Sequence, residues 1–83
     1  MANMLIALSM LNQLAEQIKA LNLTYFDQIE VSDNKLIVST SSSATMPSYE
    51  LTGEVLKMHR IVEDGSCSFK YDDDNHILTF TVK

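Results

Sequence analysis

Apolar residues recur three and four positions apart between Met4 and Leu21 and form a single stripe. The stripe is made of Met4, Ala7, Leu11, Leu14, Ile18 and Leu21. Leu8 and Ala15 widen it to the breadth that a core-facing helix needs. This spacing predicts an amphipathic helix over Met4–Leu21, with Asn22 as its terminator.

Three further apolar residues in the first two turns of this helix lie outside the stripe, namely Leu5, Ile6 and Met10. One helix face cannot bury them together with the stripe. Two interpretations are open: the rest of a small domain wraps around this end, or the three residues meet another protein or a second copy of the chain. On the second interpretation, Leu5, Ile6 and Met10 are the candidate partner surface.

After the helix, the segments Thr24–Val31 and Lys35–Thr40 predict a β-hairpin around Asp33-Asn34. Asp and Asn tolerate the positive φ that a two-residue turn requires. This turn would pair Val31 with Leu36 and Ile29 with Val38. The hairpin would then have one apolar face against the helix and one face toward water.

The stretch Ser66–Lys83 predicts a second β-hairpin, with Asp74-Asn75 as its turn. Alternate positions on both strands are apolar and would pair across the hairpin as Tyr71 with Leu78, Phe69 with Phe80, and Cys67 with Val82. The pairing predicts an aromatic inner face.

Between the hairpins, Ser39–Ser48 is rich in hydroxyl side chains and contains Pro47, which predicts a loop. The next segment, Ser48–Glu63, fits a helix better than a strand. As a helix it would be capped by Ser48, with one apolar stripe formed by Leu51, Val55, Met58 and Val62. As a strand, residues 54–62 alternate poorly. Gly65 is suited to a left-handed helix end.

These elements predict one small α+β domain over residues 1–83, in the order αββαββ, with two helices on one face of a four-stranded antiparallel sheet. The alternative is one N-terminal helix packed on an antiparallel β meander.

The chain also contains two similar turn segments forty-one positions apart, Asp33–Ile37 and Asp74–Leu78. They suggest two copies of an αββ unit. However, this alignment matches Leu36 with Ile77. Leu36 is predicted on the inner face of the first hairpin, whereas Ile77 is predicted on the outer face of the second. Either the halves are true copies and one face is assigned wrongly, or only the turn chemistry is shared.

The chain carries six basic and eleven acidic residues, a net charge of −5. The basic residues form no cluster, so direct nucleic-acid binding is disfavoured. Cys67 is the single cysteine and fits a reducing compartment. The apolar run at the start is too short to span a bilayer, and the first residues lack the positive charge of a signal peptide. We therefore expect a cytoplasmic protein that does not contact membranes.

No motif in the chain points to catalysis, a cofactor or a metal. The run Asp72–Asn75 could offer carboxylates to a cation, but adjacent strand residues face opposite ways, which favours a solvated turn. Of the soft metal ligands, Cys67 and His76 lie too far apart on the predicted hairpin to share a zinc ion, and His59 is on another element. We expect no catalytic, cofactor-binding or metal-binding residues, although enzymatic activity stays open.

Three hypotheses for the function remain. The first is a non-enzymatic protein-protein interaction module: a small acidic homodimer, inhibitor or adaptor. The second is a small-ligand-binding or enzymatic domain with a site between sheet and loop, which would use Tyr25, His59 or His76. The third is an acidic nucleic-acid mimic in phage or host defence.

Overall fold

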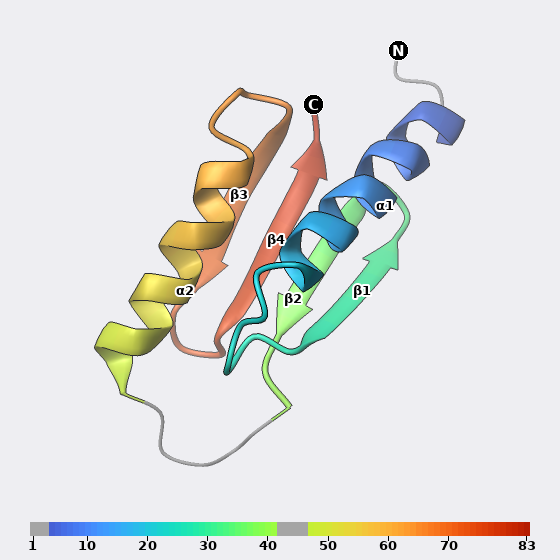
Figure 1. Cartoon of the computed structure of the whole chain (residues 1–83). Coiled ribbons are helices and arrows are strands. Elements are labelled where there is room, and N and C mark those ends of the chain that lie inside the picture. The colour runs from blue at the N-terminus through green and yellow to red at the C-terminus, as the bar shows by residue number, and fades with distance from the viewer. Residues whose placement is uncertain (1–3, 42–46) are drawn as a thin grey trace.

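Two helices cover one face of a four-stranded sheet (Figure 1). The computed structural model describes residues 4–41 and 47–83, with side chains described from Leu8 onward. The elements in chain order are α1 (Met4–Lys19), β1 (Gln28–Ser32), β2 (Lys35–Ser39), α2 (Ser48–Ile61), β3 (Cys67–Asp72) and β4 (Ile77–Val82). The predicted α+β fold in αββαββ order is confirmed. The meander alternative is wrong, because residues 54–61 are helical.

The strands lie in the order β1-β2-β4-β3, and every neighbouring pair is antiparallel. Both hairpins have the predicted register, with Val31 opposite Leu36 and Phe69 opposite Phe80. The two hairpins join where β2 pairs with β4, which brings Leu36 beside Phe80. The aromatic inner face of the second hairpin therefore continues into the aliphatic inner face of the first.

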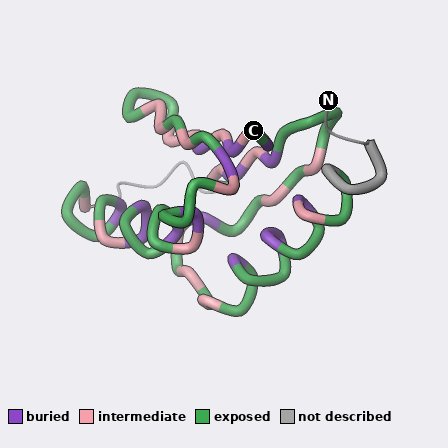
Figure 2. The backbone as a smooth tube through the Cα atoms, turned by 90° about the horizontal axis from the view of Figure 1, so that it is seen from above, coloured by how far each residue is buried: buried purple, intermediate pink, exposed green. Residues whose placement is uncertain are grey.

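The core lies between the helices and the sheet, where the buried positions in Figure 2 face one another. The stripe predicted for α2 is buried in full, as are Leu11, Leu14, Ala15 and Ile18 of α1. Leu8 does not belong to this core, since 44% of its surface is exposed. Its assignment to the core-facing stripe was therefore wrong.

Several predicted boundaries also differ from the structure. Thr24–Asp27 forms a loop before β1 rather than the start of a strand. Ser48 does not cap α2, because Pro47 takes the N-cap position and no side chain bonds the free N–H groups there. The second turn spans residues 73–76, with His76 at a φ of 56°. In the predicted serine-rich loop, residues 42–46 lie outside the described residues.

Asn22 ends α1 as predicted, whereas Gly65 is not the cap of α2, because the C-cap of that helix is Val62 and Gly65 lies in the following turn. Asn22 has a φ of 51° just after α1, and its N–H donates to the carbonyl of Lys19. Gly65 has a φ of 83° after α2, and its N–H donates to the carbonyl of Val62. A positive φ carries little steric cost for glycine and is tolerated by asparagine, which explains these residue types in the turns that follow the two helices.

The two αββ halves have the same architecture, but buried positions do not correspond at a spacing of forty-one. They correspond at forty in the helices and the first strands, as Leu11 does with Leu51 and Ile29 with Phe69. In the return strands the spacing is forty-two, as for Leu36 and Leu78, because the second turn is two residues longer. Even spacings keep each strand residue on its face, whereas forty-one would invert it. The spacing of forty-one between the two turn segments is therefore not the spacing at which the two halves correspond in structure.

One buried carboxylate ties α2 to the loop between α1 and β1. The Glu54 side chain, only 8% exposed, accepts hydrogen bonds from the backbone N–H groups of Thr24, Tyr25 and Phe26 at 3.0–3.2 Å. These donors belong to a loop, and no strand or helix supplies them with acceptors. We call this contact the Glu54 latch.

The latch predicts a large loss of stability for Glu54→Gln. The amide has a single acceptor oxygen and brings two N–H donors toward three backbone donors, so we expect a loss of about 1.5–3 kcal/mol in the free energy of unfolding. Chemical denaturation followed by circular dichroism measures it. The matched control is Glu50→Gln on the same helix, which changes a single exposed hydrogen bond with Tyr25 and should cost well under about 1 kcal/mol. Equal losses in both variants would contradict the special role of the latch.

Candidate interaction surface

The structure places the predicted partner residues on the first two turns of α1. The backbones of Leu5 and Ile6 are helical, and their side chains lie outside the described part of the chain. Met10 is partly buried and packs against the core. Leu8, between them in sequence, has 44% of its surface exposed. This end of α1 therefore presents at least one large apolar side chain to solvent.

A hollow of about 230 Å³ opens next to Met10, between α1 and the segment that leads from α2 into β3. Apolar and polar side chains share its wall. The lining residues are Met10, Gln13, Leu14, Gln17, Ile61, Val62, Asp64, Ser66 and Cys67. Such a mixture suits a side chain of another protein that has an apolar stem and a polar tip.

The hollow and the Glu54 latch occupy equivalent places in the two halves. Forty positions before Glu54 the chain has Leu14, which cannot accept a hydrogen bond and leaves the facing loop to satisfy itself. That loop does so locally, with the N–H of Ser66 donating to the Asp64 carboxylate at 3.0 Å. This hydrogen bond also lowers the pKa of Asp64, which keeps a negative charge at the rim of the hollow. The loop at one end is thus tied to the facing helix by a carboxylate, whereas the loop at the other end bonds to itself. A second hollow, of about 380 Å³, lies beside the latch and has a mainly polar lining of Thr24, Tyr25, Glu50, Gly53, Glu54 and Lys57.

The three residues of the ligand-site hypothesis make separate contacts. The Tyr25 hydroxyl donates to the Glu50 carboxylate at 2.7 Å, and this bond raises the pKa of Tyr25. The His59 ring stacks on Phe69 with ring centroids 4.7 Å apart, and His76 lies in the β3–β4 turn with Nδ1 3.4 Å from the Tyr71 hydroxyl. The structure does not join these residues into one cluster with a shared geometry for catalysis.

The remaining polar candidates have local partners. The Asp72 carboxylate accepts from the backbone N–H groups of Asp74 and Asn75 and from the Asn75 amide, which closes the β3–β4 turn. Cys67 is buried, and burial raises the pKa of its thiol, so it stays protonated at neutral pH. Within residues 4–41 and 47–83, no three His, Cys, Asp or Glu side chains are grouped closely enough to hold a metal ion.

Sequence reasoning missed the two features that distinguish the ends. Glu54 interrupts the apolar side of α2 and could have been noticed as an acid beside Val55, but its acceptor role depends on a loop thirty positions earlier in the chain. The hollow depends on packing between elements and had no signal of its own in the sequence.

Comparisons of this chain with protein-family models, with curated proteins and with solved structures find no match. In the described part of the chain, neither helix has the length and apolar character needed to cross a membrane.

The Asp72 turn predicts a specific pH dependence. The hydrogen bonds from Asn75 lower the pKa of Asp72 below its ordinary value of 3.8, so its stabilising contribution is present above that value. The contribution is lost as the pH falls through the lowered pKa. Asp72→Asn should therefore be less stable than the natural chain at neutral pH, and the difference should shrink below about pH 4. Thermal unfolding across a pH series measures this. A difference that stays constant down to pH 2 would contradict it.

Proposed function

We propose that this protein is a non-enzymatic protein-protein interaction module, a small acidic homodimer, inhibitor or adaptor, whose partner surface is the start of α1. The observation that carries the proposal is the apolar end of α1 beside the open hollow. Leu8 is exposed there, Met10 lines the hollow, and Leu5 and Ile6 belong to the same two turns. Contiguous apolar surface next to a concavity is typical of a docking surface.

The charge of the chain adds to the proposal. A net charge of −5 favours solubility and disfavours phosphate backbones as partners. Asp64 at the rim of the hollow favours a partner segment that brings a Lys or Arg side chain. The aliphatic stem of such a side chain would lie along Leu14 and Ile61, with its cation toward the carboxylate. We place this interaction in the cytoplasm, which agrees with a lone, buried thiol.

The proposal predicts that Leu5→Asp combined with Met10→Asp keeps the circular-dichroism spectrum of a folded protein and abolishes partner capture. Aspartate at these positions would have to lose its hydration in the complex, which opposes binding. Affinity capture from the native host, followed by calorimetry with each purified candidate, measures the loss. Unfolding of the double variant would show that these side chains belong to the core.

Because Met10 is partly buried, a second variant separates docking from folding. Leu8→Asp changes an exposed side chain on the same helix and should leave the thermal midpoint nearly unchanged while it weakens partner binding. Glu16→Gln, on a polar part of the same helix, is the control and should bind like the natural chain. A Leu8→Asp variant that binds its partner with unchanged affinity would exclude this part of the surface.

A further inference from the structure

Strand β3 is an outer strand of the sheet and pairs only with β4 in the described part of the chain. The N–H of Lys83 donates to the carbonyl of Ser66, so residues 66 and 83 form a hydrogen-bonded pair. In an antiparallel ladder such pairs alternate, which directs the backbone groups of Ser68 and Lys70 toward β4. The backbone N–H and C=O groups of Cys67, Phe69 and Tyr71 therefore point out of the sheet. This edge is a template for another strand.

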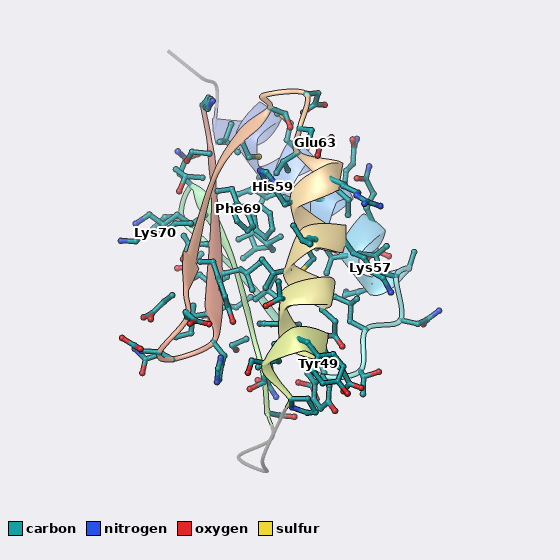
Figure 3. All side chains as sticks on the ribbon, turned by 90° about the vertical axis from the view of Figure 1, so that its left-hand side faces the viewer. Tyr49, Lys57, His59, Glu63, Phe69 and Lys70 are labelled. Carbon is teal, nitrogen blue, oxygen red and sulfur yellow. The ribbon has the colours of Figure 1, made fainter. Side chains whose placement is uncertain are left out.

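The helix beside this edge presents apolar side chains along it. Figure 3 looks onto the edge and shows His59 of α2 directed toward Phe69 of β3. Leu56 precedes His59 by three positions, so the two lie on the same side of α2. Leu56 is 52% exposed, and the Phe69 ring is only partly buried. A second strand added to β3 would cover both.

The opposite edge of the sheet provides an internal comparison. At β1, the helix positions equivalent to Leu56 and His59 are Glu16 and Lys19. These two form an exposed salt bridge with a distance of 3.5 Å between nitrogen and oxygen. Charged side chains beside an outer strand are a common device against unwanted strand pairing. On the helix flank the chain has this device at β1, whereas at β3 the flank carries Leu56 and His59 and the charge lies on the strand itself, at Lys70.

We propose that two copies of this chain pair through their β3 strands, antiparallel and edge to edge, to form one continuous eight-stranded sheet with four helices on one face. The interface differs from the partner surface at the start of α1 and does not depend on that assignment. The two-fold axis passes through Phe69, so that Phe69 faces its equivalent and Cys67 faces Tyr71 of the second copy. All six outward backbone groups of these residues then obtain partners in each copy.

Charge and strand length select this register. The residues whose backbone groups point outward, Cys67, Phe69 and Tyr71, must pair with one another in the two copies. Any other register that keeps them paired therefore moves the two-fold axis along β3 and changes the residue opposite Lys70. A shift that centres the axis on Lys70 places two lysines directly opposite each other, which is unfavourable. A shift toward Asp72 sets Lys70 against that carboxylate but leaves much of β3 unpaired, since the strand ends there. With the axis at Phe69, Lys70 faces Ser68 of the second copy and nearly the whole strand is paired.

The helices are compatible with this arrangement. Because His59 lies level with Phe69, the two copies of α2 run antiparallel beside the axis, with each Leu56 against the other helix. Each copy contributes one short strand and one flank of a helix, so the contact belongs to the small end of specific interfaces. We therefore expect a reversible dimer that is populated at high protein concentration.

The first experiment compares two exposed leucines. Light scattering of the natural chain across a dilution series should give a mass that rises to twice that of the chain. Leu56→Asp should weaken the dimer by about tenfold or more, because a carboxylate would have to lose its hydration at the contact. Leu8→Asp tests the other candidate surface at the start of α1, and Glu16→Gln on the polar part of α1 is the control that should leave the dimer unchanged. A natural chain that stays monomeric at every concentration overturns the proposal.

The same comparison separates this proposal from the partner surface. Loss of the dimer with Leu8→Asp and not with Leu56→Asp would overturn β3 pairing and assign self-association to the start of α1. Loss with Leu56→Asp alone supports β3 pairing and leaves the start of α1 free for another protein.

The second experiment tests the register. Ser68 and Lys70 are exposed on the face of the sheet opposite the helices, and in the dimer their Cα atoms face each other at about 4.5 Å, within the range of a disulfide. With Cys67→Ala as background, the double variant Ser68→Cys, Lys70→Cys should form a covalent dimer with oxidised glutathione. Each single variant should react far more slowly. Equal cross-linking by Lys70→Cys alone, or none by the double variant, overturns the proposed register.

Discussion

The structure depends on the pairing of β2 with β4, which is the strand pairing that joins the two hairpins in the described part of the chain. Each half has one helix and a two-stranded hairpin, and a hairpin with one helix buries too little apolar surface to be stable alone. Pairing β2 with β4 places Leu36 beside Phe80 and Val38 beside Leu78, all four with no exposed surface. The sheet becomes four strands wide, which is the width that two adjacent helices cover. Folding of either half is therefore coupled to folding of the other.

The shared architecture makes the differences between the halves informative. Equivalent positions carry Glu54 in one half and Leu14 in the other, and both are buried. The acid ties the facing loop to α2 by accepting hydrogen bonds from three backbone N–H groups, whereas the leucine contributes to the apolar part of the wall of the hollow beside Met10. Because the two halves fold alike, a position that carries different side chains in the two halves is not fixed by the shared architecture alone. The two hollows differ in the same way: the one beside Met10 has a partly apolar wall, and the one beside Glu54 has a mainly polar wall. The apolar part of the wall is why the hollow beside Met10 supports a docking function better.

Local patterns predicted most of the fold. Alternation in the strands and the Asp33-Asn34 turn specify the pairing of Val31 with Leu36, and these signals lie within a few residues of one another. The stripe of Leu51, Val55, Met58 and Val62 likewise identified α2.

The errors arose where contacts between residues far apart in the sequence determine the local structure. Thr24–Asp27 has the composition of a strand, but its N–H groups bond Glu54 thirty residues later, and Leu8 has helical spacing but lies outside the core. The candidate site was only partly predictable for the same reason: Met10 could be identified as surplus on its helix, but the hollow beside it could not.

The two outer strands show how function can be separated from folding in so small a domain. The core needs only one face of each helix and one face of the sheet, so side chains on the flanks of the helices can vary at little cost in stability. Beside β1 this flank carries the charged pair Glu16 and Lys19, which keeps the strand edge hydrated. At β3 the equivalent flank of α2 carries Leu56 and His59. These two side chains contribute little to the core and do not form a charged pair beside the strand edge. Exposed apolar surface favours aggregation unless something covers it, and the proposed pairing of β3 with its own copy would cover it in a closed, finite assembly. A dimer formed there would place the two α1 starts at opposite ends of a four-helix layer, because the two-fold axis lies beside α2. The protein would then have two identical docking sites, and a partner that can span both would bind more tightly than either site alone allows.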